Sequence, residues 1–169
     1  MVTLSRGPNH RTVPAGSSST RETTLRFLAE PGDVNFGGKV HGGAVMKWID
    51  QAGYTCAVAW SGHYCVTVHV GDIQFLHPIL IGHLVEVNAR IIHTGRTSLH
   101  LAVEVRAGDP REDGLSRTTR CTMVFVAVSS TGAPVPVHPW IPATTEDIAL
   151  EKYALRQMVL RRTPEAALT

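Results

Sequence analysis

The strongest hydrophobic pattern in the chain has the period of an α-helix and begins near Gly42. When residues are placed at 100° intervals, the apolar positions of this run fall on one stripe. They are Val45, Trp48, Ile49, Ala52, Cys56 and Ala59. Gly62 can end the helix, because glycine readily adopts the left-handed conformation common at helix C-termini. We therefore predict a long amphipathic helix from Gly42 to about Ser61, with Asp50 at the edge of the apolar stripe.

Downstream of this helix the pattern changes to the two-residue alternation of β-strands. Strands are predicted over residues 64–75, 84–92, 99–105 and 118–128, and an earlier one over residues 22–28. In the first strand after the helix, the valines occupy even-numbered positions up to Val70, and the apolar residues that follow occupy odd-numbered positions from Ile73. This shift of one residue at Gly71 and Asp72 predicts a β-bulge. The next two strands predict an antiparallel hairpin. The last strand, over residues 118–128, has apolar residues on both of its faces in its second half, which is typical of a central strand.

The remaining segments complete the predicted order. Residues 1–20 are polar and rich in Pro, Gly and Ser, so we expect a flexible N-terminal tail. Residues 21–130 are expected to form the folded domain. Residues 131–169 are expected to be a Pro-rich linker and a C-terminal helix, which the capping pair Thr144 and Asp147 opens. The order of one strand, a long helix and four strands predicts an α+β fold with the helix on one face of an antiparallel sheet.

The composition fits one globular domain, since 43% of the 169 residues are hydrophobic and 18% are charged. The formal net charge is +2 and the basic residues are scattered, so no nucleic-acid partner is expected. No apolar stretch reaches the length of a membrane span, and the polar N-terminus lacks the apolar core of a signal peptide. The three cysteines are typical of buried thiols in a reducing compartment. We therefore expect a cytoplasmic protein that binds no metal.

The Gly-rich loop before the long helix provides candidate chemistry. It delivers the unpaired N–H groups of Gly42 and Gly43, and the positive end of the helix dipole, to one place. These donors suit an oxygen that carries or develops negative charge. Asp50, two turns further on, is placed where a general base or nucleophile would act on a polarised carbonyl. From the residues alone, the alternative is a surface acid on an amphipathic helix behind a flexible loop.

Five short motifs occur in a fixed order along the chain. They are Pro31-x-Asp33-x-Asn35, His41-Gly42-Gly43, Met46-Lys47-Trp48-Ile49-Asp50, Phe75-x-x-Pro78-x-x-x-Gly82 and Gly95-Arg96-Thr97-Ser98. This ordered set resembles the hotdog-fold acyl-CoA thioesterases, in particular the broad-range bacterial enzymes and the brain-type cytosolic acyl-CoA hydrolases. The resemblance implies a sheet wrapped around the central helix. It also implies homodimers that share active sites at their interface and often assemble into trimers of dimers, which are hexamers.

The activity that this resemblance implies is hydrolysis of fatty acyl-CoA to a free fatty acid and coenzyme A. No cofactor is expected, because one carboxylate and backbone donors are enough for this reaction. Coenzyme A is part of the substrate and product. Asp50 matches the family's carboxylate, which either activates a water or attacks the thioester. The N–H groups of Gly42 and Gly43 match the donors that polarise the carbonyl, and Asn35 and His41 are placed in the same site. A thiolate leaves with little acid help, because thiols are far more acidic than alcohols.

The turn Gly95-Arg96-Thr97-Ser98 resembles the segment that meets coenzyme A in these enzymes. Arg96 is expected to bind a phosphate, because its guanidinium presents a rigid fork of donors. Gly95, Thr97 and Ser98 are expected to lie beside the same part of the substrate. An ordinary hairpin turn with an exposed arginine is the alternative.

Two other functions are compatible with a hotdog fold. A non-catalytic module would bind acyl-CoA without cleaving it, although such a module has no need for an ionisable group such as Asp50 at the thioester. A hotdog enoyl-CoA hydratase would pair a histidine with an acid, for which His41 and Asp50 are candidates. Asp72 lies one residue from a position where related chains often carry a carboxylate, and we expect a structural role for it.

Overall fold

The computed structural model describes residues 20–162, so the flexible tail predicted for residues 1–20 lies almost wholly outside the described residues. In chain order the elements are β1 (Glu22–Leu28), the 3-10 turn η1 (Pro31–Asp33), α1 (Gly42–Ser61), β2 (Tyr64–Phe75), β3 (Leu84–Thr94), β4 (Ser98–Gly108), β5 (Ser116–Val128) and α2 (Thr145–Arg162). Every predicted strand and helix is present, and several extend a few residues beyond their predicted ends. Neither α-helix in this part of the chain is long and apolar enough to cross a membrane.

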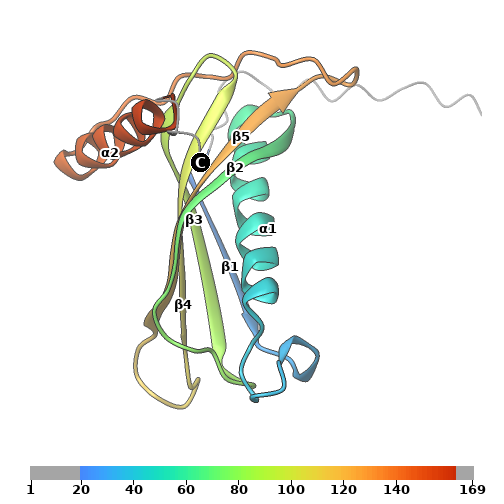
Figure 1. The fold of residues 1–169 in the computed structure, drawn as a ribbon. Helices are drawn as coiled ribbons and strands as arrows, with labels where there is room; N and C mark the ends of the chain where they lie inside the picture. Colours follow the sequence, from blue (N-terminus) through green and yellow to red (C-terminus); the bar gives the residue numbers. More distant parts are fainter. Residues whose placement is uncertain (1–19, 163–169) are drawn as a thin grey trace, which may run out of the picture.

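The strands form one antiparallel sheet in the order β1, β3, β4, β5, β2 (Figure 1). Strands β3 and β4 make the predicted hairpin, and β5 lies inside the sheet as predicted. Strands β1 and β2 are the two edges. One side of each edge strand therefore has no neighbour in the sheet, which leaves backbone groups available for pairing.

Helix α1 packs along one face of the sheet, which curves around it (Figure 1). Most of the predicted stripe is buried: Val45, Trp48, Ile49, Ala52 and Cys56. The expectation for Ala59 is wrong, because Ala59 is exposed while Gly53 and Ala57 are buried. Glycine at position 53 allows the helix to approach β5 closely, since an added Cβ would lie only 2.9 Å from the Phe125 ring. The buried stripe therefore turns toward β5 in the middle of the helix.

Strand β2 has two register irregularities against β5. One lies between Thr67 and His69, and the other between Gly71 and Gln74. Asp72, inside the second, has a φ of 52°, a conformation that residues other than glycine rarely adopt. The β-bulge predicted at Gly71 and Asp72 is thus confirmed. The first irregularity is missing from the prediction, because the alternation of valines continues through it without a break in the sequence.

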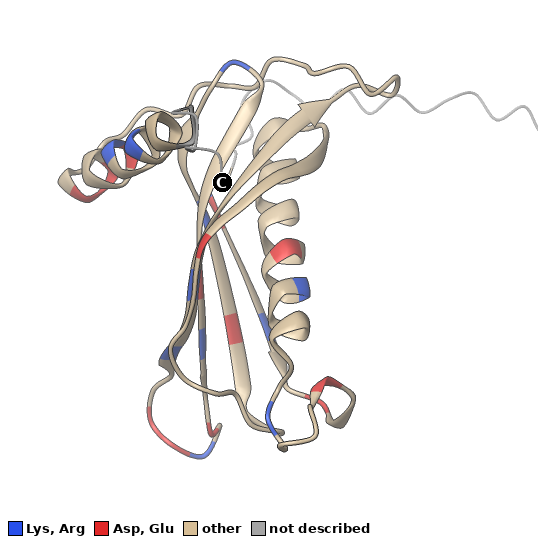
Figure 2. Ribbon diagram, viewed as in Figure 1, with Lys and Arg blue, Asp and Glu red and all other residues tan. Residues whose placement is uncertain are grey.

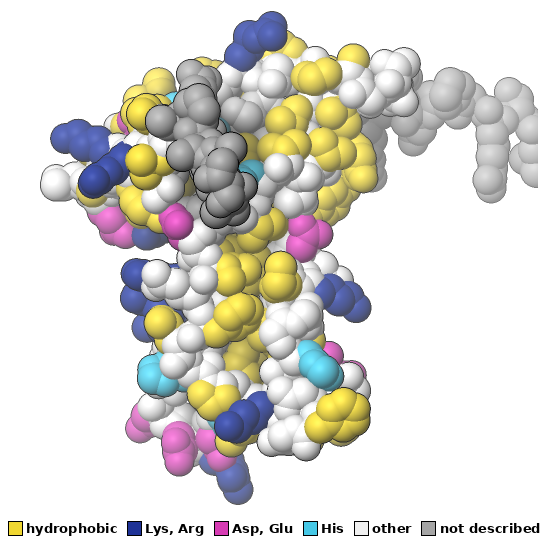
Figure 3. Space-filling view, in the orientation of Figure 1, with side chains coloured by type: hydrophobic (Ala, Val, Ile, Leu, Met, Phe, Trp, Pro, Cys, Tyr) yellow, Lys and Arg dark blue, Asp and Glu magenta, His cyan; other side chains and the backbone are white. Residues whose placement is uncertain are grey.

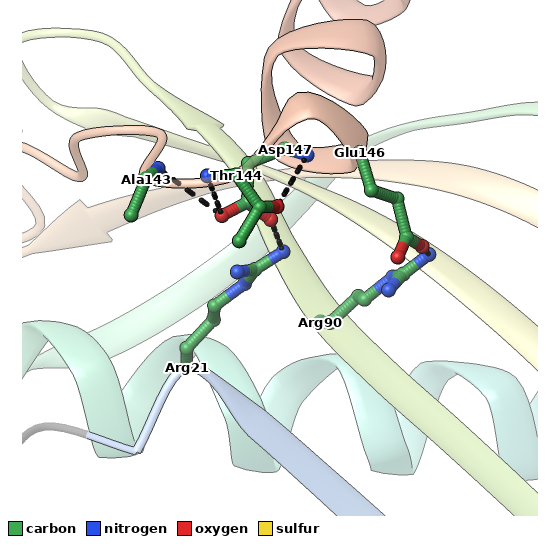
Figure 4. Close-up of polar contacts among 6 residues, drawn as sticks. All are labelled: Arg21, Arg90, Ala143, Thr144, Glu146 and Asp147. Atoms are coloured by element: carbon green, nitrogen blue, oxygen red, sulfur yellow. Dashed lines mark hydrogen bonds and ion pairs between the residues drawn. The ribbon is translucent and has the colours of Figure 1, made fainter.

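Helix α2 packs on the other face of the sheet, against β3 (Figure 1). Its predicted cap is present: the Asp147 N–H donates to Thr144 Oγ1 and the Thr144 N–H donates to Asp147 Oδ2, both at 3.1 Å. Figure 4 shows that the guanidinium of Arg21, just before β1, also reaches the Asp147 carboxylate, at 2.5 Å. Beside it, Arg90 of β3 contacts Glu146 at 2.7 Å. The first turn of α2 is therefore anchored by two ion pairs.

Candidate active site

The start of α1 is open. His41 is the N-cap residue, with φ −60° and ψ 137°, but its exposed side chain makes no capping hydrogen bond. Gly42 and Gly43 follow as the first two helical residues, and no described residue accepts a hydrogen bond from their N–H groups. They have no acceptor within the helix either, because the first four N–H groups of a helix lack one. Two backbone donors and the positive end of the helix dipole therefore face the space in front of α1.

The loop before α1 is shaped by Asn35. The Asn35 Oδ1 accepts hydrogen bonds from the N–H groups of Gly37, at 2.9 Å, and Lys39, at 3.3 Å. A cavity of about 340 Å³, here named the helix-start cavity, opens beside this loop. Its walls come from the loop, the first turns of α1, β5 and the end of β2 with the segment that follows it, and they include Asn35, Lys39, Gly42, Phe75, His77 and Thr119. Two of the predicted site residues, Asn35 and Gly42, therefore line one cavity.

Asp50 points from α1 toward β2. Its Oδ1 accepts a 2.7 Å hydrogen bond from the hydroxyl of Thr67. Asp50 and Lys47 are the only Asp, Glu, Lys or Arg residues in α1 (Figure 2). Since Asp50 is exposed, water can reach its second carboxylate oxygen. The sequence prediction does not include Thr67 in the site. The one feature of the sequence that could have indicated it is that Thr67 is a polar residue on the same face of the strand as the buried Cys65.

The carboxylate and the backbone donors of one chain are far apart. Asp50 follows Gly43 by seven residues, which corresponds to about 11 Å of helical rise. A single thioester group cannot contact both across that distance. His41 precedes Asp50 by nine residues, or about 13 Å of rise. These two residues therefore do not form, within one chain, the pair that a hydratase would require.

The turn Gly95-Arg96-Thr97-Ser98 lies at the opposite end of the molecule from the start of α1 (Figure 1). The turn is tight, because the Gly95 N–H donates to the Ser98 carbonyl at 2.9 Å and an added Cβ at Gly95 would lie 2.5 Å from Ser98 Oγ. Arg96 is exposed, and no described side chain pairs with its guanidinium. The predicted coenzyme A residues and the helix start therefore do not meet within one chain.

The other groups that commonly carry chemistry have structural environments. Within residues 20–162, no group of three or more His, Cys, Asp or Glu side chains could hold a metal ion. Cys56, Cys65 and Cys121 are free and buried. Burial raises the pKa of the Cys56 and Cys121 thiols to about 12. Because only a thiolate is strongly nucleophilic, these cysteines are inert at neutral pH.

Comparison with known proteins identifies the class of this chain. A family model described as the thioesterase superfamily matches residues 37–113. The acyl-CoA thioester hydrolase YciA of Salmonella typhimurium is 32% identical over 119 residues, which cover 69% of this chain and 90% of the relative. The crystal structure of an apo hexameric acyl-CoA thioesterase is 29% identical with a TM-score of 0.82, and the match covers 88% of this chain and 95% of that one. A hexameric thioesterase from Yersinia pestis is 33% identical with a TM-score of 0.65, covering 69% and 94%.

Fold and sequence together define a thioesterase of the hotdog type. The chain belongs to the acyl-CoA thioester hydrolase family. This membership confirms both the hotdog fold and the enzyme class, an acyl-CoA hydrolase, that the sequence predicts.

Proposed function

We propose that this chain hydrolyses fatty acyl-CoA thioesters to a free fatty acid and coenzyme A. One observation carries the proposal. Helix α1 carries the Asp50 carboxylate, which the Thr67 hydroxyl of β2 holds in place, and the start of the same helix exposes the N–H groups of Gly42 and Gly43. Hydrolysis of a thioester needs a base or nucleophile, and donors for the oxygen that becomes negative. The residues of this site offer both.

The reaction can begin in two ways at Asp50. As a general base, the carboxylate takes a proton from a water whose oxygen attacks the carbonyl carbon. As a nucleophile, a carboxylate oxygen attacks that carbon itself, and water then cleaves the resulting anhydride. In both routes the carbonyl oxygen gains negative charge, which the N–H groups of Gly42 and Gly43 stabilise, before the carbon–sulfur bond breaks. Loss of one such donor typically lowers the rate by about 100-fold to 1,000-fold.

A complete site requires two chains, because about 11 Å of helical rise separates Asp50 from the Gly43 N–H in one chain. The exposed edge of β2 offers a surface where the second chain can bind. Large apolar side chains are exposed on this strand, at Tyr64, Val68, Val70 and Phe75, and at Leu76 directly after it. Figure 3 shows hydrophobic side chains in a band down the middle of this face. Because an unpaired apolar edge strand favours pairing with another sheet, we propose a homodimer in which the β2 edges meet.

This pairing also accounts for the coenzyme A residues. If the two β2 strands pair antiparallel about a twofold axis, the turn at one end of a chain lies beside the helix start of its partner. Arg96 of the partner subunit is then proposed to bind a phosphate of coenzyme A, with Gly95, Thr97 and Ser98 of that turn around it. Both solved structures compared above are described as hexameric. We therefore extend the proposal to a trimer of such dimers.

The deciding experiment measures thiol release from a series of acyl-CoA esters of increasing chain length. Wild type is compared with Asp50→Asn and with a control, Asp113→Asn, which removes an exposed carboxylate from the loop after β4. We expect turnover by wild type and by the control, and a loss of roughly 100-fold or more in Asp50→Asn, the range typical of a general base.

Other outcomes would overturn the proposal. A wild-type protein that binds acyl-CoA without releasing thiol would be a binding module rather than a hydrolase. Full activity in Asp50→Asn would leave the carboxylate without a role in the reaction. Hydration of crotonyl-CoA, followed by ultraviolet absorbance in place of thiol release, would indicate a hydratase.

A further inference from the structure

Tyr153 of α2 reaches the bulge in β2. Its hydroxyl donates a hydrogen bond to Asp72 Oδ2, which joins segments 81 positions apart in the chain. The ion pairs of α2 go elsewhere, to the residue just before β1 and to β3. The contact between Tyr153 and Asp72 therefore links α2 to the edge strand that carries part of the candidate site.

The bulge itself is held on both sides by β5. The Thr122 hydroxyl donates to the Gly71 carbonyl at 3.2 Å, and Arg120 Nε donates to Gln74 Oε1 at 2.8 Å. Between these contacts, Asp72 has a positive φ of 52°. A residue with a side chain is strained in this conformation, so it persists only where its surroundings support it. The contact from α2 acts on the strained residue directly.

The residues that follow the bulge form one wall of the helix-start cavity. All of residues 75–79 line it. The far end of this segment is tied to the loop before α1, because the Val40 N–H donates to the Ile79 carbonyl at 2.9 Å. At the near end the Phe75 ring faces Gly42, where an added Cβ would lie 3.6 Å from the ring. Since strand side chains alternate between faces, a slip of one residue at the bulge would displace this wall.

The carboxylate end of the site lies on the other side of the bulge. Thr67, which holds Asp50, pairs in register with Phe125, and this pairing precedes both irregularities of β2. A change confined to Asp72 therefore alters the cavity wall and leaves the hydrogen bond to Asp50 in place.

We propose that Tyr153 is a positioning residue: through Asp72 it fixes the register of β2, and thereby places one wall of the helix-start cavity. That wall includes the apolar side chains of Phe75, Leu76 and Ile79, which we take to contact the acyl chain. This inference rests on the proposed thioesterase function. The contact does not touch the reacting atoms. Its effect should appear in how well substrates of different chain length bind, and not in the ionisation of Asp50.

The test compares wild type with Tyr153→Phe, with the double variant Tyr153→Phe/Asp72→Gly, and with the control Glu151→Gln. The control takes the charge out of a different α2 contact, the 3.1 Å pair between Glu151 and His93. Glycine at position 72 adopts a positive φ without strain, so the double variant should keep the bulge without help from Tyr153. The measurements are kcat and KM for short and long acyl-CoA esters, the pH profile of kcat, and amide hydrogen exchange of residues 64–75.

We expect Tyr153→Phe to raise KM about five- to tenfold for long acyl chains, the size of effect that one lost hydrogen bond can produce. The pH profile should stay that of wild type, exchange in β2 should quicken, and the double variant should restore both exchange and KM. Wild-type behaviour in Tyr153→Phe, failure of the glycine to rescue, or an equal change in Glu151→Gln would each overturn the inference. Hydrogen exchange shows whether Tyr153 holds β2 in place even if the wild-type protein has no thioesterase activity. Inactivity of the wild type would overturn the thioesterase proposal and not this one.

Discussion

The Thr67 hydroxyl donates a 2.7 Å hydrogen bond to Asp50 Oδ1, which joins edge strand β2 to helix α1. The bond holds one carboxylate oxygen in place and leaves the other open to water or to a substrate. A carboxylate that must meet a carbonyl carbon at a fixed angle gains rate from such positioning.

We predict that Thr67→Val lowers kcat about tenfold, because a lost hydrogen bond of about 1.4 kcal/mol corresponds to that factor. Valine keeps the shape of threonine but cannot donate. Thr67→Ser retains the hydroxyl and should keep most of the activity. Steady-state kinetics on one acyl-CoA checks both variants, and equal kcat values for valine and serine would show that the hydroxyl does not matter.

The start of α1 gives the second prediction. An added Cβ at Gly43 has no neighbour within 4 Å among residues 20–162 apart from its own turn of the helix, so we expect substitution there to leave the fold intact. The open space is where we place the thioester oxygen, and a branched side chain would occupy it. Gly43→Val should therefore reduce turnover by roughly 100-fold or more, as for a lost oxyanion donor, while size-exclusion chromatography shows the same assembly as wild type. Retained activity would argue against these N–H groups as the donors.

The third prediction concerns stability in the middle of the same helix. Gly53→Ala would place a Cβ 2.9 Å from the Phe125 ring and 3.0 Å from Met123 Sδ. Overpacking of this kind typically costs about 1–3 kcal/mol, which outweighs the gain of about 0.5–1 kcal/mol that alanine brings to a helix interior. Urea denaturation should show a destabilised Gly53→Ala. The matched control, Gly43→Ala in open space, should be neutral or slightly stabilised; equal behaviour of the two variants would contradict the packing argument.

Some features of this fold are encoded locally in the sequence, and others depend on how distant elements pack. The bulge at Asp72 was predictable because it breaks the parity of the strand, and the cap of α2 because Thr144 and Asp147 stand at capping distance. Ala59 was misplaced because an ideal helical wheel takes no account of where a curved sheet approaches the helix. Thr67 was missed because its partnership with Asp50 depends on how two elements pack, a relation that neither local pattern contains.

The cysteines give the fourth prediction. Cys56, Cys65 and Cys121 are all buried, and desolvation raises the pKa of each thiol, to about 12 for Cys56 and Cys121. An aromatic disulfide reagent at pH 8, which reacts with thiolates, should therefore find no reactive thiol among them in the native protein and three per chain after denaturation. Rapid native labelling of any of the three would show that the core opens locally. If the native cysteines do not react, they also add no background signal to the thiol-release assay.

The last prediction concerns the anchor of α2 in acid. The Arg21 guanidinium, aided by the N–H groups of Ala143 and Thr144, lowers the pKa of Asp147 to about 2 against the opposing effect of burial. In the unfolded chain an aspartate titrates near pH 3.9. Because the folded pKa is the lower one, the charged carboxylate stabilises the fold fully above about pH 4, and this contribution is lost as the pH falls toward 2.

Urea denaturation of wild type and Asp147→Asn at several pH values checks this, at one fixed protein concentration because assembly also affects stability. Asparagine keeps the size and part of the capping ability of aspartate but cannot form the ion pair with Arg21. The midpoint of wild type should exceed that of the variant at pH 5 and above, and the gap should close between about pH 4 and pH 2. A gap that stays constant over this range would mean that the shape of the side chain, and not its charge, anchors α2 to the sheet.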